Sequence, residues 1–167
     1  AARDLVAAAA AAHAENVSVA LVEQPYRVAG RRSPAPAHQL DTAWIAVLDH
    51  LRASELHGLA LVAGGRSSGA RVACRTAVAT GAVGVLCLAF PLQPPRRTGT
   101  APSRLDELEA VTVPTLVVQG VRDAFGMPPP GKRRVVVQVA GDHSLKSDLD
   151  AVGAAVGDWL AEVVPAP

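Results

Sequence analysis

Short runs of mostly apolar residues alternate along the chain with longer segments in which apolar residues recur at every third or fourth position. A short apolar run is typical of a buried strand, whereas the longer spacing is typical of one face of a helix. The runs that predict strands are Val17–Val22, Leu59–Ala63, Val83–Ala89, Thr115–Gln119 and Arg134–Val139.

The helices predicted around these strands rest on alanine content or on apolar spacing, both of which favour a helix. They are expected over Ala2–His13, around Leu40, Trp44, Val47 and Leu51, after the GGRSSG motif to about Thr80, over Ser103–Ala110, and around Leu149, Val152, Val156, Trp159 and Val163. The stretch from Gln24 to Pro36 is rich in Pro, Gly and Arg and predicts a loop.

Apolar strands that are separated by helices are typical of a parallel sheet covered on both faces. Crossover connections in such a sheet are right-handed. The sequence thus predicts an α/β fold, a doubly wound, mostly parallel sheet with helices on both faces. With 167 residues the chain has the length of one domain, so we expect a single domain over residues 1–167.

Composition excludes several classes of function. Basic and acidic residues nearly balance, at 16 against 15, which argues against a nucleic-acid-binding protein. No apolar run reaches the roughly 18 residues of a membrane-spanning helix, so we expect a cytoplasmic protein without a membrane partner. Cys74 and Cys87 stand in apolar stretches without metal-binding spacing. We therefore expect buried, reduced thiols and neither a metal nor a cofactor.

The clearest chemical signal follows the strand Leu59–Ala63 directly. Residues 65–69, Gly-Arg-Ser-Ser-Gly, form a G-x-S-x-G motif between a strand and a helix, which is the context of a nucleophile elbow. Small residues two positions before and after the serine let strand and helix approach, and only the frame centred on Ser67 has them. An alternative is a loop that caps a helix or binds phosphate, but no Lys follows to reach a phosphate.

Two later strands also end in polar residues. Asp123 follows the strand Thr115–Gln119, and His143 lies between the strand Arg134–Val139 and the last helix. Because parallel strands end at one edge of a sheet, we expect Ser67, Asp123 and His143 to lie together there. Serine, acid and histidine in this order match the triad of α/β-fold hydrolases. Taken singly, Asp123 is also compatible with a turn and His143 with an exposed loop.

Other ionisable residues are weaker candidates, because they stand out of order or beside a helix end. We expect exposed positions for His13, His38, His50 and His57, a capping or solvated role for Asp142, Asp148 and Asp150, and solvated loop charges for Arg31, Arg32, Arg96 and Arg97.

Four segments carry a resemblance to a known family. LALVAGGRSSGARVACRTA, VLCLAFPLQPP, VPTLVVQGVRDAFG and AGDHSLK resemble core segments of small α/β-hydrolase-like proteins. They are most similar to the branch with bacterial dienelactone-hydrolase-like proteins and a scaffold subunit of a eukaryotic histone acetyltransferase complex. The resemblance extends from about Val17 to the C-terminus. It implies that Ser67 is the nucleophile, His143 the general base and Asp123 the residue that orients the base.

The resemblance also implies an oxyanion hole with two backbone donors. Ser68, the residue after the nucleophile, supplies one N–H, and a His-Gly-Ala-Gly type loop ahead of the first helix supplies the other. No such loop precedes the helix Ala2–His13, and His57-Gly58 stands at a different place. We therefore expect this chain to lack roughly one to three N-terminal strands of the family and to have an incomplete oxyanion hole.

Two hypotheses about function follow. The first is a serine hydrolase that cleaves small esters, thioesters or lactones through the triad, with a small-molecule substrate and no cofactor. The second is a catalytically weak or inactive α/β-hydrolase-like scaffold that binds a protein partner, as some relatives do. Labelling of the serine by a fluorophosphonate distinguishes the two.

Overall fold

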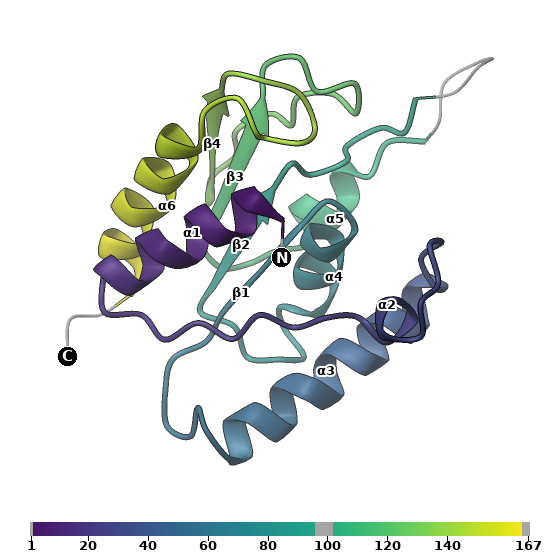
Figure 1. Cartoon of the computed structure of the whole chain (residues 1–167), viewed down its shortest axis with the longest axis vertical. Coiled ribbons are helices and arrows are strands. Elements are labelled where there is room, and N and C mark those ends of the chain that lie inside the picture. Colours follow the sequence, from purple (N-terminus) through teal and green to yellow (C-terminus); the bar gives the residue numbers. More distant parts are fainter. Residues whose placement is uncertain (1, 96–101, 165–167) are drawn as a thin grey trace.

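The computed structural model describes residues 2–95 and 102–164 (Figure 1). In this part of the chain, helices separate β1, β2 and β3, whereas β4 follows β3 without a helix between them. The elements are α1 (Arg3–Ala14), α2 (Pro25–Val28), α3 (Ala37–Ala53), β1 (Val62–Arg66), α4 (Ser68–Thr76), β2 (Gly84–Leu88), α5 (Leu105–Glu109), β3 (Thr115–Gly120), β4 (Arg134–Val139) and α6 (Leu149–Val163).

The strands form a parallel sheet in chain order, β1-β2-β3-β4. The register places Gly65 of β1 opposite Cys87 of β2, and Cys87 opposite Val117 of β3. Every residue of β3 is buried, because strands flank it on both sides and helices cover the sheet. The parallel arrangement brings the loops that follow the strands to one edge of the sheet.

Helices cover both faces of the sheet. On one face α1 and α6 pack together, and Val156 and Trp159 of α6 lie in one core with Leu88, Leu116 and Val118 of the strands. On the other face lie α4 and α5, and α3 packs against α4 (Figure 1). The predicted fold, a mostly parallel sheet with helices on both faces, is confirmed.

The prediction of a strand at Val17–Val22 is wrong. The segment belongs to no sheet, and its side chains are half-buried or exposed. A strand needs backbone partners on a neighbouring strand, and in the described part of the chain β1 pairs only with β2. Val17 and Val19 instead pack against the core beneath α1 and α6. Their apolar character reflects this packing and not strand pairing.

The other predicted elements are present, some with shifted ends. β1 starts at Val62 and not at Leu59, because its pairing with β2 begins there. α4 ends at Thr76, earlier than expected. The predicted loop 24–36 contains the one-turn helix α2.

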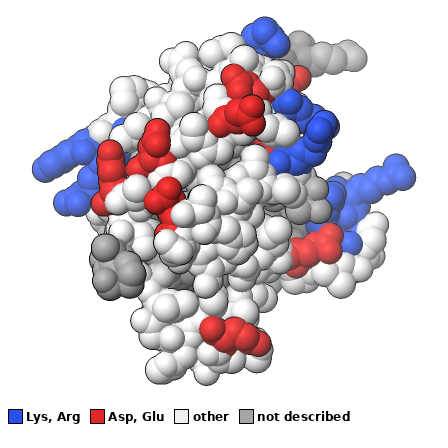
Figure 2. Space-filling model, turned by 60° about the vertical axis from the view of Figure 1, so that its left-hand side comes forward, with Lys and Arg blue, Asp and Glu red and all other residues white. Residues whose placement is uncertain are grey.

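Charged side chains of both signs lie around broad uncharged areas on the face shown in Figure 2. This distribution agrees with the near balance of 16 basic and 15 acidic residues in the sequence. Among the described residues, no helix combines the length and the apolar character that crossing a membrane requires.

Candidate active site

Ser67 stands in the sharp turn that joins β1 to α4. Its backbone has φ 54° and ψ −112°, a conformation that residues other than glycine rarely adopt. The Ser67 N–H donates to the Leu88 carbonyl at 2.9 Å, which holds the turn against the end of β2. A strained serine between a strand and a helix is the geometry of a nucleophile elbow.

The two glycines of the motif differ in the space that surrounds them for a side chain. A Cβ atom on Gly65 would lie 2.4 Å from the backbone carbonyl carbon of Gly69, so β1 and α4 leave no room for a side chain there. A Cβ atom on Gly69 would meet nothing within 4 Å. The expectation that both positions require a small residue is therefore wrong for Gly69. It contributes its backbone to the contact, but a side chain there would point into open space.

His143 lies in the loop between β4 and α6 and makes two side-chain contacts. Its Nε2 atom is 2.8 Å from Oγ of Ser67, and its Nδ1 atom is 2.8 Å from Oδ2 of Asp123. Because a carboxylate accepts a hydrogen bond, a neutral ring here carries its proton on Nδ1. Nε2 is then free to accept the proton of the Ser67 hydroxyl. The structure thus brings the three residues selected from the sequence into one chain of hydrogen bonds.

The Asp123 carboxylate is held in place on both oxygens, with only 1% of its side chain exposed. Oδ2 also accepts from Gln119 Nε2 at 2.8 Å, and Oδ1 accepts from the Phe125 N–H at 2.9 Å. The same Nε2 atom also lies 3.1 Å from the Phe90 carbonyl oxygen and 2.9 Å from that of Gly126, so its two hydrogens are shared among three acceptors. These bonds replace the hydration that the buried carboxylate loses and keep it directed at the imidazole.

A cleft of about 210 Å³ opens beside Ser67. Ser67 and Ser68 line it together with residues from the loop before α3, from α4 and from the loop after β2. Phe125 also lines the cleft, and its ring centroid lies 4.3 Å from that of His143. The cleft therefore gives a small molecule access to the Ser67 hydroxyl.

A comparison of the sequence with known protein families shows to which of them the chain belongs. The model of the alpha/beta hydrolase domain family matches residues 3–164. The chain belongs to this family. A comparison with curated proteins gives no match.

Solved structures share the fold of this α/β hydrolase. A serine hydrolase without a lid from Xanthomonas campestris has a TM-score of 0.70 at 18% identity, over 99% of this chain and 75% of that one. A serine hydrolase homologue from Coxiella burnetii has a TM-score of 0.66 at 14% identity, over 95% and 76%. A thermophilic esterase from Thermogutta terrifontis has a TM-score of 0.58 at 16% identity, over 80% and 75%.

Arg66 connects the elbow of the hydrolase to α1 and to the loop of His143. Its Nε atom lies 2.7 Å from Oδ2 of Asp4 in α1, and its Nη2 atom donates to the His143 carbonyl at 2.8 Å. Only 1% of the Asp4 side chain is exposed. The guanidinium therefore compensates a buried charge and at the same time holds the backbone that carries the imidazole.

Asp4, Arg66 and Gln119 support the site but were not predicted from the sequence. The available signals were an acidic residue at the start of an alanine-rich helix and a glutamine at the end of an apolar strand. Neither signal names a partner, because the partners are distant in sequence.

We expect Arg66→Met to destabilise the protein more than Asp4→Asn. The first change leaves a carboxylate buried without a counter-charge, whereas the second leaves a guanidinium whose side chain is 27% exposed. Leaving a buried charge unpaired costs about 3 to 5 kcal/mol, and for this partly exposed pair we expect about 2 to 3 kcal/mol. Urea unfolding measures the free energy of unfolding of each single variant. The double variant with Arg66→Met and Asp4→Asn should be more stable than Arg66→Met alone. Equal losses in the two single variants would contradict the charge-burial account.

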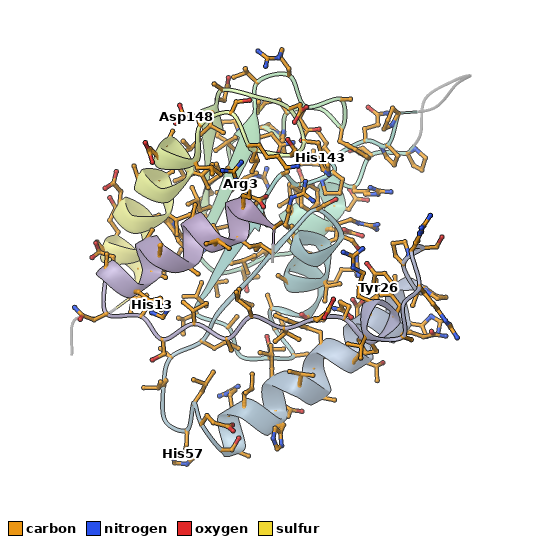
Figure 3. All side chains as sticks on the ribbon, in the orientation of Figure 1. Arg3, His13, Tyr26, His57, His143 and Asp148 are labelled. Carbon is orange, nitrogen blue, oxygen red and sulfur yellow. The ribbon has the colours of Figure 1, made fainter. Side chains whose placement is uncertain are left out.

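The other histidines show no contact with the three residues of the site among the interactions of the described residues. The four histidines that precede Ser67 in the sequence are all exposed, as expected. Figure 3 shows His13 and His57 well separated from His143. Asp148 caps α6 by accepting from the Ala151 N–H at 3.0 Å.

The remaining candidates from the sequence have local roles. Asp142 accepts from the hydroxyl and the N–H of Ser144, and these bonds lower the pKa of Asp142. Cys74 and Cys87 are buried and unbridged, with their Sγ atoms 3.5 Å apart. The hydrogen bond to Cys74, together with burial, raises the pKa of Cys87. The prediction of buried, reduced thiols is confirmed.

Within residues 2–95 and 102–164, no group of three or more His, Cys, Asp or Glu side chains is arranged to hold a metal ion. Arg31 and Arg32 are exposed, in agreement with the expected loop charges. Arg96 and Arg97 lie outside the described residues.

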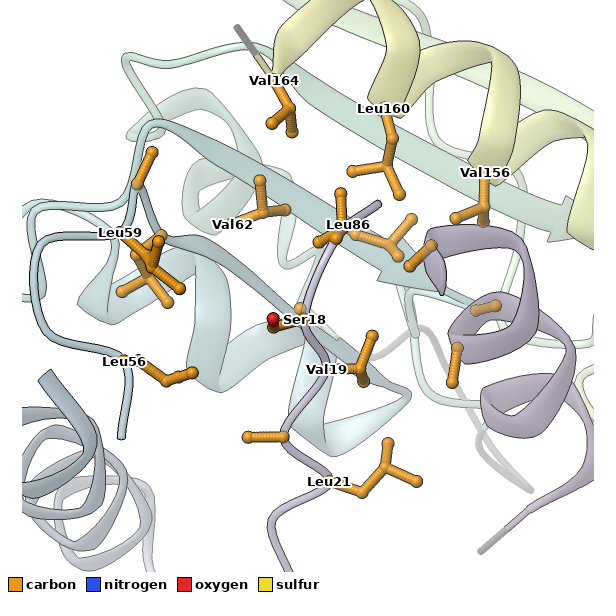
Figure 4. A pocket seen from close by; sticks show the side chains of 18 of the residues that line it. Ser18, Val19, Leu21, Leu56, Leu59, Val62, Leu86, Val156, Leu160 and Val164 are labelled. Carbon is orange, nitrogen blue, oxygen red and sulfur yellow. The ribbon is translucent and has the colours of Figure 1, made fainter. Parts of the chain in front are cut away.

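A larger cavity of about 700 Å³ lies between α1, α3 and the outer edge of β1. Its lining is mostly apolar and includes Val19, Leu59, Val62 and Leu160 (Figure 4). Among the described residues, none lines both this cavity and the cleft beside Ser67. Residues 17–21 and β1 both line this cavity, so the segment lies near the strand without pairing with it.

Proposed function

We propose that this α/β hydrolase is a serine hydrolase that cleaves small esters, thioesters or lactones. The observation that carries the proposal is the continuous hydrogen-bond chain from Ser67 through His143 to Asp123, with 2.8 Å at each step. Membership of the hydrolase family supports the reaction class. The cleft of about 210 Å³ is below the usual range of pockets for drug-sized ligands, which supports a small substrate.

In the proposed mechanism, Oγ of Ser67 attacks the carbonyl carbon of the substrate while Nε2 of His143 takes the hydroxyl proton. Asp123 stabilises the imidazolium through Nδ1–H. The tetrahedral intermediate then collapses: the bond to the leaving oxygen or sulfur breaks, and that atom receives the proton from Nε2. A water molecule, deprotonated by the same nitrogen, attacks the acyl-serine, and the acid leaves as Oγ regains its proton.

Ser68 would stabilise the negative charge on the carbonyl oxygen. It is the first residue of α4, where backbone N–H groups have no partner within the helix. The partial positive charge of the helix N-terminus adds to this effect. Removal of one oxyanion donor typically lowers a rate by 10²–10³-fold, so a hole with Ser68 as its single donor would support slow turnover.

The expected relation to dienelactone hydrolases and the single-domain organisation remain predictions.

A fluorophosphonate probe tests the proposal. We expect the probe to phosphonylate the folded chain at Ser67, because among the described residues only this hydroxyl is hydrogen-bonded to a ring nitrogen of a histidine. Trypsin would cut after Arg66 and Arg71 and release both serines of the motif in one peptide, and fragmentation of that peptide assigns the adduct. The Ser67→Ala variant and heat-unfolded protein are the controls and should remain unlabelled.

An adduct on Ser68 would reassign the nucleophile. Absence of any adduct on the folded protein would contradict the hydrolase proposal and favour the scaffold alternative, in which the fold is retained to bind a protein partner.

A further inference from the structure

Three arginines line the cleft beside Ser67: Arg71, Arg75 and Arg104. Two of them are neutralised by bidentate contacts. Nε and Nη2 of Arg71 bind the Glu107 carboxylate at 2.8 and 2.6 Å. The same two atoms of Arg75 bind the Asp41 carboxylate at 2.8 and 2.6 Å, and its Nη1 atom reaches Glu107 at 3.2 Å.

Arg104 differs from the other two. Its Nη1 atom donates to the Pro91 carbonyl at 3.0 Å, and its backbone N–H donates to the Leu92 carbonyl at 2.8 Å. In the part of the chain that the structure describes, no carboxylate forms an ion pair with it. The cluster therefore combines three guanidinium groups with two carboxylates and has one positive charge in excess.

The surroundings of Arg104 disfavour its positively charged form. Burial and the neighbouring positive charge of Arg71 lower the pKa of Arg104, although Glu107 opposes them. A carboxylate that entered the cleft would find a planar donor group with which it can form short, charge-assisted hydrogen bonds. The partial exclusion of water would strengthen this attraction relative to a fully exposed arginine.

We propose that Arg104 binds a carboxylate group of the substrate, so that the enzyme prefers monoesters of dicarboxylic acids to neutral esters of the same size. This inference rests on the proposed function, because it names the substrate class of the same site. Arg104 would act as a specificity-determining residue. The contacts to Pro91 and Leu92 would hold it at the cleft that also contains Ser67.

Paired substrates of equal size test the preference. Monoethyl glutarate carries the carboxylate, and ethyl glutaramate replaces it with a neutral amide while keeping the ester and the leaving ethanol unchanged. Ethanol release gives kcat/KM for both. A charge-assisted contact predicts a ratio of roughly 10 to 100 in favour of the charged ester. A ratio near one in the native protein would overturn the inference.

Substitutions then test whether the Arg104 side chain causes the ratio of the two kcat/KM values. Arg104→Gln should lower the ratio by about tenfold or more, whereas Arg104→Lys should retain part of it because the positive charge remains. Lys132→Gln removes an exposed positive charge away from the cleft and should keep the native ratio. An unchanged ratio in Arg104→Gln would also overturn the inference, and a purely structural defect would lower both rates together.

A binding measurement separates this inference from the proposed function. Calorimetric titration of monoethyl glutarate into the Ser67→Ala protein needs no turnover, so it reports on Arg104 even if the ester is never cleaved. We expect binding that weakens by about tenfold or more when Arg104→Gln is added. Equal binding by the two proteins would refute the carboxylate site, whereas failure of fluorophosphonate labelling alone would refute only the hydrolase.

Discussion

Ser67→Ala should lower kcat/KM for a small ester by about 10⁴ to 10⁶-fold, with little change in the free energy of unfolding. The substitution removes the atom that His143 Nε2 contacts at 2.8 Å, and without it the histidine has no nucleophile to activate. Losses of this size are typical when the nucleophile of a catalytic triad is removed. Initial-rate measurements with a nitrophenyl acetate substrate, together with urea unfolding, check both parts.

Ser68→Ala is the matched control for this assignment. The adjacent serine lies in the same motif and lines the same cleft, but its proposed contribution is a backbone N–H that alanine also has. We expect a loss within about tenfold, far smaller than for Ser67. Comparable losses in the two variants would show that the nucleophile was assigned to the wrong hydroxyl.

Gly65→Ala should prevent the native elbow from forming and should reduce the free energy of unfolding by about 4 kcal/mol or more. The added Cβ atom would lie 2.4 Å from the carbonyl carbon and 2.7 Å from the carbonyl oxygen of Gly69. Both are backbone atoms, so no side-chain rotation relieves the clash, and β1 and α4 must move apart. Because Ser67 stands between these elements, we expect fluorophosphonate labelling to be lost as well.

Gly69→Ala is the control, since it adds the same methyl group to the other glycine of the motif. That methyl group meets nothing within 4 Å, and alanine favours the helical conformation over glycine by about 1 kcal/mol. Unchanged or slightly increased stability in urea is therefore expected. If the two variants were equally destabilised, the close approach at Gly65 would not be the reason for the motif.

The position of Ser67, Asp123 and His143 could be predicted because each stands just after a strand of a parallel sheet. A strand of this kind is recognisable from its own apolar residues, and parallel strands end at one edge of the sheet. The local pattern was therefore sufficient to predict that His143 lies beside Ser67 and Asp123, which are 76 and 20 positions away in the sequence. The same local information failed at Val17–Val22, because a strand also needs a neighbour that its own residues do not specify.

The residues that support and extend the site depend on partners that chain spacing does not reveal. Arg66 meets Asp4 because α1 packs across the sheet near the elbow. Among the described residues, Arg104 has no carboxylate partner, because the nearby carboxylates already bind Arg71 and Arg75. Apolar periodicity and strand-end chemistry are properties of a segment, so the sequence specifies them directly. Ion pairing and burial depend on which side chains the folded chain brings within a few ångströms, and here packing assigned the partners.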